Sequence, residues 1–127
     1  MRLEVLVGEL AICRLDPGAP LPAWARGDLV ATVRSAAELT VVCDAAAVPA
    51  GVRAADGWRA LRVAGPLDLG LTGVLAALLG PLAEREVPIF AVSSYDTDYV
   101  LVPAQWLGAA CGALEDAGHE ISGVRPA

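Results

Sequence analysis

The clearest pattern of hydrophobic and polar positions lies in the second half of the chain. Residues 60–64 alternate, with Leu61 and Val63 on one side, which predicts a strand ending at the Gly-Pro pair that follows. From residue 71 to residue 82 the apolar residues recur at intervals of three and four, which predicts one face of a helix. Pro81 is expected to kink this helix, because proline has no backbone N–H.

The elements that follow complete a recognisable unit. Residues 89–93 and 97–102 are predicted to be strands on either side of a polar turn. A second helix is expected from Pro103 to Gly118, and residues 121–124 are expected to form a last short strand. The order is strand, helix, strand, strand, helix, strand, which is the ferredoxin-like split unit.

The first half becomes interpretable as a repeat of this unit. Residues 29–43 align with residues 89–103 at an offset of 60, matching strand, polar turn and strand without a gap. The rest of the first unit is predicted to have shortened helices, with a strand at 10–15, a single helical turn at 22–26, a short turn at 44–48 and a closing strand at 52–55. An extra strand is expected at residues 3–7.

We therefore predict an α+β fold made of two ferredoxin-like units. The first unit, with the shortened helices, is expected to span residues 1–58, and the second to span residues 59–127. Neither half has a hydrophobic core large enough to predict that it folds alone, so we expect the two halves to share one extended antiparallel sheet.

Composition narrows the classes of partner. Hydrophobic residues make up 56% of the 127 residues and the formal net charge is −6. Without a cluster of Lys and Arg to neutralise phosphates, we expect no nucleic-acid partner. No apolar run has the length of a membrane-spanning helix, and acidic residues interrupt the apolar N-terminal segment, which is not typical of a signal peptide. We expect a folded cytoplasmic protein with no membrane partner.

The residues that most often bind metals are few and scattered. Cys13, Cys43 and Cys111 are widely spaced in the sequence, and we interpret them as buried thiols in a reducing compartment. His119 follows a glycine at the expected end of a helix, and we interpret it as a surface turn residue. We expect neither a metal nor another cofactor.

One long segment carries a family resemblance. GPLDLGLTGVLAALLGPLAEREVPIFAVSSYDTDYVLV, residues 65–102, resembles the C-terminal half of the small tandem ACT-domain proteins, which have a GPLD loop, a Leu-rich helix and an IFAxSxYxTDYxLV hairpin. The resemblance extends over nearly the whole chain, and the tandem arrangement is similar to that of the cytosolic arginine sensors of a eukaryotic growth-signalling pathway. It implies regulatory units that bind free amino acids or similar small effectors where two units meet. A chain with two units would form the equivalent assembly as a homodimer.

The resemblance also implies the residues that bind the effector. The contacts from the loop that enters the first helix fall on Leu71, Gly73 and Leu75, with Leu71 standing where the sensors have an acidic residue. The hairpin contacts fall on Ser94, Tyr95 and Asp98, all of matching type. The candidate ligand-binding residues are the members of these two segments: Gly70, Leu71, Thr72, Gly73, Val74, Leu75, Ser93, Ser94, Tyr95, Asp96, Thr97 and Asp98.

The chemistry of the two segments supports the same role. A glycine-rich loop at a helix start exposes backbone N–H groups and the positive end of the helix dipole, which suits a carboxylate. A nearby aspartate suits an ammonium group. A free α-amino acid carries both groups, so the two segments predict a two-point clamp.

Other interpretations of these residues and of the whole protein stay open. Thr72 has an alternative role as a helix N-cap, Asp96 as a hairpin-turn residue, and Tyr95 and Tyr99 as sheet packing. One rival function is an adaptor or oligomerisation domain without a ligand. The other is a small enzyme that uses Asp96 and Asp98 as a carboxylate pair, since residues i and i+2 of a strand share a face. Against an enzyme, the sequence has no nucleophile and base pair and no phosphate-binding glycine motif.

Overall fold

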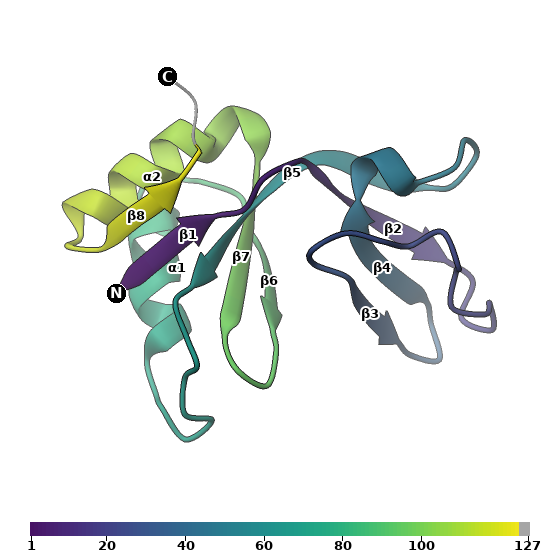
Figure 1. Cartoon of the computed structure of the whole chain (residues 1–127), viewed down its shortest axis with the longest axis horizontal. Coiled ribbons are helices and arrows are strands. Elements are labelled where there is room, and N and C mark those ends of the chain that lie inside the picture. The colour runs from purple at the N-terminus through teal and green to yellow at the C-terminus, as the bar shows by residue number, and fades with distance from the viewer. Residues whose placement is uncertain (125–127) are drawn as a thin grey trace. The chain divides into compact units, whose positions relative to one another are not determined.

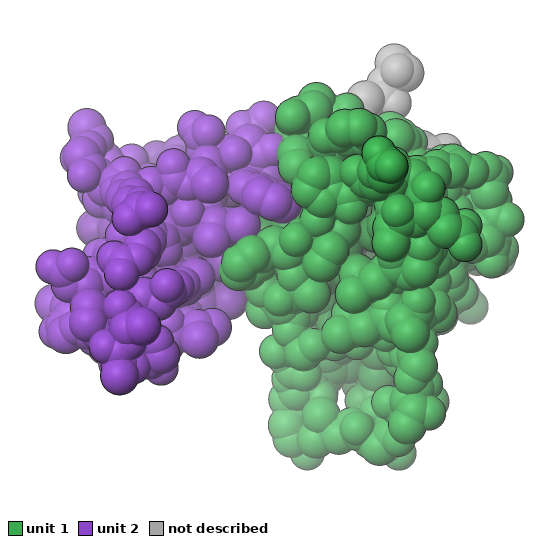
Figure 2. Space-filling view, turned by 180° about the vertical axis from the view of Figure 1, so that it is seen from behind, with its two compact units in different colours: residues 1–7, 59–127 green, residues 8–58 purple. Residues whose placement is uncertain are grey.

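A computed structural model of the chain describes residues 1–124, and these residues form two compact units (Figure 2). Unit 1 contains Met1–Val7 and the chain from Arg59 onward, and unit 2 is Gly8–Trp58. The first seven residues therefore pack with the second half of the chain, although we expected them in a first unit of residues 1–58. The reason is strand pairing between distant segments, which no local pattern reveals.

The sheet of unit 1 has the strand order β8, β1, β5, β7, β6 (Figure 1). The strand β1 pairs antiparallel with β5 and parallel with β8, and β6 pairs antiparallel with β7. The first and last strands of the ferredoxin-like unit are thus separated by β1. The bounds are β1 (Arg2–Val5), β5 (Ala54–Val63), β6 (Phe90–Ser93), β7 (Asp98–Pro103) and β8 (Glu120–Gly123).

Two helices cover one face of this sheet (Figure 1). They are α1 (Val74–Glu84) and α2 (Leu107–Asp116), and a turn of 3-10 helix, η2 (Ala104–Trp106), precedes α2. The predicted apolar spacing is confirmed, because the buried residues of the helices are Val74, Leu78, Leu82, Leu107, Ala110, Cys111, Ala113 and Leu114. Each fully buried Leu or Val contributes about 1.5–3 kcal/mol, so this face is the core of unit 1.

Unit 2 has the strand order β3, β4, β2, β5, with β2 (Leu10–Leu15), β3 (Ala31–Arg34) and β4 (Leu39–Asp44). A turn of 3-10 helix, η1 (Ala45–Ala47), follows β4. The helical turn expected at residues 22–26 is wrong: the segment is a turn closed by a 3.3 Å hydrogen bond from the Ala25 N–H to the Pro22 carbonyl. The segment is too short to nucleate a helix by itself.

The strand β5 takes part in both units. Ala54, Ala55 and Trp58 pair with β2, and Leu61 to Val63 pair with β1. The sequence predicted separate strands at residues 52–55 and 60–64, and this division is wrong. Gly57 interrupts the alternation, but it takes a positive φ of 76° where the register with β2 shifts, so it forms an irregularity within one strand.

The repeat between the two units is real, but its offset is 59, since β6 begins at residue 90 and β3 at residue 31. The same shift carries β7 onto β4 and η2 onto η1. It also matches the turns, because Ser94 N–H donates to the Thr97 carbonyl at 2.8 Å and Ser35 N–H donates to the Glu38 carbonyl at 2.9 Å. The predicted offset of 60 is therefore wrong by one residue.

Candidate functional site

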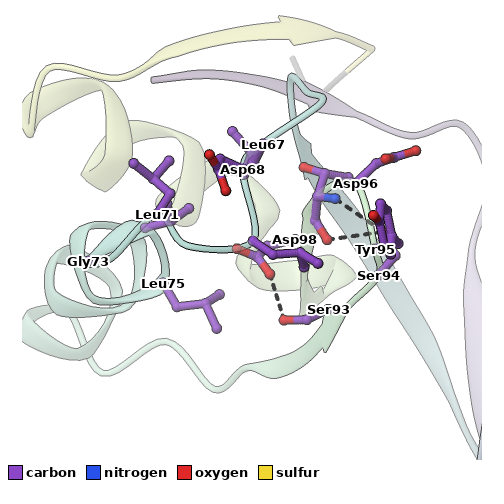
Figure 3. Close-up of a pocket in the computed structure, with 13 residues that line it drawn as sticks. Leu67, Asp68, Leu71, Gly73, Leu75, Ser93, Ser94, Tyr95, Asp96 and Asp98 are labelled. Carbon is purple, nitrogen blue, oxygen red and sulfur yellow. Dashed lines mark hydrogen bonds between the residues drawn. The ribbon is translucent and has the colours of Figure 1, made fainter.

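A pocket of about 340 Å3 lies in unit 1, between the loop that precedes α1 and the β6–β7 hairpin (Figure 3). All of the predicted ligand-binding residues line it except Gly70 and Thr72. Three residues that the sequence analysis did not propose line it as well. The full lining is Leu67, Asp68, Leu69, Leu71, Gly73, Val74, Leu75, Ser93, Ser94, Tyr95, Asp96, Thr97 and Asp98.

The start of α1 provides unpaired backbone donors to this pocket. Gly73 is the N-cap residue, with φ of 81°, and no side chain caps the helix. The first helical hydrogen bond runs from the Ala77 N–H to the Gly73 carbonyl at 2.9 Å, so the N–H groups of the first turn have no partner within the helix. The alternative role of Thr72 as N-cap is wrong. Gly73, Val74 and Leu75 line the pocket, so the positive end of the helix dipole is accessible to an anion.

The hairpin provides a carboxylate. Asp98 is the first residue of β7 and is half-buried, and it pairs in register with Ser93 at the end of β6. The Ser93 hydroxyl donates a hydrogen bond of 2.6 Å to Asp98 Oδ1 (Figure 3). An ionised carboxylate has about four acceptor sites, so Asp98 retains the capacity to accept from a ligand.

Hydrogen bonds fix the hairpin turn to the rest of unit 1. The Thr97 hydroxyl, which is buried, donates to the Val63 carbonyl of β5 at 2.6 Å, and the Thr97 N–H donates to Ser94 Oγ at 3.2 Å. The Leu67 N–H donates to the Asp96 carbonyl at 2.6 Å. The last bond joins the loop side of the pocket to the hairpin side, so the two sides are held together without a ligand.

The loop before α1 is organised by Asp68, which the sequence analysis missed. Asp68 Oδ1 accepts from the Gly70 N–H at 2.8 Å, and the Asp68 carbonyl accepts from the Leu71 N–H at 3.0 Å. The Gly70 N–H, which we expected to face an effector, is therefore engaged within the loop. The GPLD motif was the available signal for Leu67 and Asp68, since it directly precedes the predicted segment.

The two sides of the pocket differ in chemistry. The side of the loop and α1 is lined by aliphatic side chains and by Asp68, whereas hydroxyl and carboxylate groups line the hairpin side. The charged lining residues are all aspartates, namely Asp68, Asp96 and Asp98. Tyr95 is 79% exposed at the rim, so its alternative role in sheet packing is wrong, while Tyr99 is half-buried in β7 and does not line this pocket.

The corresponding turn of unit 2 lacks the carboxylate. With the offset of 59, Asp98 corresponds to Leu39 and Ser94 corresponds to Ser35. Leu39 is fully buried, in the core of unit 2. The repeat has thus kept the hairpin in both units but an acidic side chain at this position only in unit 1.

Two negative findings concern the described residues. Within residues 1–124, no group of three or more His, Cys, Asp or Glu side chains is placed to hold a metal ion. Over the same residues, no helix has the length and apolar character that crossing a membrane requires. Cys13, Cys43 and Cys111 are buried thiols, as the sequence predicted.

Comparison of the sequence with models of known protein families identifies the family of this chain. A model of the ACT domain matches residues 53–116. The chain belongs to the ACT-domain family. A second family model, described as an N-terminal domain, matches residues 8–51 of this ACT-domain protein, which is most of unit 2. The resemblance inferred from the GPLD loop and the hairpin is confirmed.

Similar proteins are found among solved structures and curated sequences. A crystal structure from Agrobacterium tumefaciens is 32% identical to this ACT-domain protein, with a TM-score of 0.91 and coverage of 98% of this chain and 94% of that one. The regulatory subunit of aspartate kinase from Thermus thermophilus, in its ligand-free form, shares the fold with a TM-score of 0.61 at 15% identity, over 91% and 97% of the two chains.

The human cytosolic arginine sensor for mTORC1 subunit 1 is 32% identical over 59 residues, which are 46% of this chain. Those residues are only 18% of the sensor. This ACT-domain protein therefore matches a small part of that relative, and the match supports membership of the family.

Proposed function

We propose that this protein is a non-catalytic regulatory module that binds a free amino acid, or a similar small effector, in the pocket of unit 1. The observation that carries the proposal is that the uncapped start of α1 and the half-buried carboxylate of Asp98 line the same pocket. Backbone N–H groups at a helix start bind a carboxylate, and Asp98 binds an ammonium group. A free α-amino acid has both groups on one carbon atom.

Two relatives support a regulatory role. One is named a cytosolic arginine sensor and another is a regulatory subunit of aspartate kinase. Both names describe proteins that respond to a small molecule or control another activity, and neither describes a catalytic ACT unit. The family membership of this chain makes the same kind of role the simplest proposal.

The positions of Asp96 and Asp98 do not support the rival function as an enzyme. The argument for a catalytic pair required Asp96 and Asp98 to be on one strand, but β7 begins at Asp98 and Asp96 lies in the exposed turn. Asp98 is already hydrogen-bonded to Ser93. The nucleophiles that line the pocket with the two aspartates are serine, threonine and tyrosine hydroxyls, and no histidine is among the lining residues to act as their base.

We also propose that the working form is a cytoplasmic homodimer in which the effector binds where ACT units meet. Three large apolar side chains, Leu69, Leu71 and Tyr95, line the pocket and are exposed to solvent. An exposed apolar rim around a pocket suits a second protein surface. Sedimentation velocity at tens of micromolar, with and without amino acids, tests this proposal, and a monomer under both conditions would contradict it.

A titration of the full chain with each free amino acid tests the function. Isothermal calorimetry should give saturable binding of at least one amino acid, and the ligand should be recovered unchanged by chromatography after prolonged incubation. Conversion of the ligand would support the rival enzyme. Absence of binding to every amino acid would support the adaptor without a ligand.

A further inference from the structure

We infer that the effector is an amino acid with an uncharged aliphatic side chain, and that Leu71 is a residue that determines this specificity. The inference rests on the proposed function, because it concerns the side chain of a ligand whose α-amino and α-carboxylate groups occupy Asp98 and the start of α1. It follows from what remains of the pocket once those two groups are placed.

Apart from Asp68, the side chains on the remaining side of the pocket are aliphatic. Leu71 and Leu75 project from the loop and from α1 on the side opposite Asp98 and Ser93 (Figure 3). Leu67 and Val74 complete this side, and both pack with the core of unit 1. A ligand held by Asp98 and by the N–H groups of α1 therefore directs its side chain along leucine and valine side chains.

The aspartates that remain are poorly placed to select a cationic side chain. Asp68 and Asp96 are exposed to solvent, whereas Asp98 is half-buried. One oxygen of Asp68 already accepts from the Gly70 N–H. Ion pairs between exposed groups contribute at most about fivefold to affinity, so Asp68 and Asp96 add little for a lysine or arginine ligand.

Burial of an aliphatic side chain contributes more than such an ion pair. Each methylene group removed from water contributes about fourfold to affinity. Leucine has three more side-chain carbons than alanine, so full burial against Leu71 and Leu75 contributes up to roughly sixtyfold over alanine. A lysine or arginine stem would gain similar contact, but the charged end must stay hydrated and the long side chain loses more rotamer freedom.

Competitive calorimetry on the full chain tests the inference with alanine, valine, isoleucine, leucine, lysine and arginine. We expect one of the branched aliphatic amino acids to bind at least about tenfold more tightly than both alanine and lysine. Tighter binding of lysine or arginine would overturn the inference and leave the proposed function standing. Absence of binding by any amino acid would overturn the proposed function as well.

The Leu71→Asp variant makes the test specific to one residue. Leu71 is 55% exposed, so the substitution should preserve the fold, and Leu21→Asp in unit 2, where Leu21 is 62% exposed, is the matched control. We expect L71D to bind the aliphatic amino acid at least about tenfold more weakly, with L21D like wild type. An L71D variant that keeps the wild-type order of affinities would overturn the assignment of Leu71.

Discussion

The hydroxyl of Ser93 donates a 2.6 Å hydrogen bond to the carboxylate of Asp98, directly across the β6–β7 pair. An acidic residue is disfavoured within a strand unless a partner stabilises it, and here the partner belongs to the neighbouring strand. Because the serine is fixed by the sheet, it also limits the rotation of the carboxylate. Asp98 is thus held towards the pocket before any ligand arrives.

We predict that Asp98→Ala abolishes effector binding and leaves the fold intact. Removing one side of a hydrogen-bonded charge pair costs about 2–5 kcal/mol, which is roughly thirtyfold to several thousandfold in affinity. Ligand at 100 times its dissociation constant should stabilise the wild type by about 2.7 kcal/mol. Thermal unfolding with and without the amino acid should show almost none of this stabilisation in the variant.

The matched control for this variant is Asp56→Ala, which removes an exposed carboxylate from unit 2. It should keep the full ligand-induced rise in melting temperature. Ser93→Ala should weaken binding less than Asp98→Ala does, since it removes the orienting bond and keeps the charge. A D98A protein that retains the full rise would show that Asp98 is a structural strand residue and that the site lies elsewhere.

Two glycines of unit 1 should respond in opposite directions to substitution by alanine. Gly73 has φ of 81°, which costs an L-residue about 1–2 kcal/mol, although an added Cβ would meet nothing within 4 Å. Gly108 lies within α2, where an added Cβ would also meet nothing within 4 Å, and alanine there should stabilise the helix by up to about 1 kcal/mol. Urea unfolding of the two variants measures both changes. Equal effects would mean that Gly73 is not strained in the folded state.

Thr97→Val should destabilise unit 1 by about 1–3 kcal/mol, because the Val63 carbonyl loses its buried donor and the shape of the side chain is kept. Thr32→Val on the exposed edge strand β3 is the matched control, and its free energy of unfolding should change by less than about 0.5 kcal/mol. Urea unfolding checks both variants. If the free energy of unfolding fell by the same amount in both variants, the hydrogen bond from Thr97 would not be a specific source of stability.

The buried thiol of Cys13 should make stability depend on pH in the alkaline range. Burial, together with the neighbouring Cys43, raises the pKa of Cys13 from 9.0 to about 11. The unfolded chain therefore loses this proton first as pH rises. The contribution to stability is complete below about pH 9 and is lost as pH rises through about 11, by at most about 2–3 kcal/mol.

Urea unfolding between pH 8 and pH 11 measures that slope, and Cys13→Ala should show a smaller one. A thiol reagent at pH 8 should react with Cys13 only as fast as the protein opens, since the folded thiol is almost entirely protonated. Rapid labelling of the native protein at Cys13 would contradict the burial of this side chain.

Local patterns predicted most elements of unit 1, and the reasons for the failures are physical. The helices α1 and α2 were visible because a periodic apolar face is a property of consecutive residues. The place of β1 beside β8 depends on the pairing of residues 2–5 with residues 120–123, and no window of sequence contains both. Residues 52–55 and 60–64 were predicted as separate strands, because the positive φ of Gly57 and the shift of register beside it depend on the pairing with β2, which the local sequence does not contain.

The lining of the pocket was predicted best where it lies on regular structure. All of the predicted hairpin residues line the pocket, because strand, turn and strand fix which side chains meet. The loop was predicted less well, since Leu67, Asp68 and Leu69 have no periodicity and reach the pocket through one backbone bond to Asp96. The one-residue error in the repeat also concealed that Asp98 corresponds to Leu39.

The pairing of β1 with β5 gives the chain a nested architecture. Val5 lies opposite Leu61, and the Leu6 N–H donates to the Ala60 carbonyl at 2.9 Å, so the point where the chain leaves unit 1 and the point where it returns are neighbours on antiparallel strands. Residues 8–58 are thus an insertion into a hairpin. No single cut separates the two units, because a fragment that begins at Arg59 would lose β1, which lies between β5 and β8 in its own sheet. Excising the insertion and closing Val7 to Arg59 with a tight turn would instead keep β1, β6, β7 and β8 whole, together with the part of β5 that belongs to unit 1.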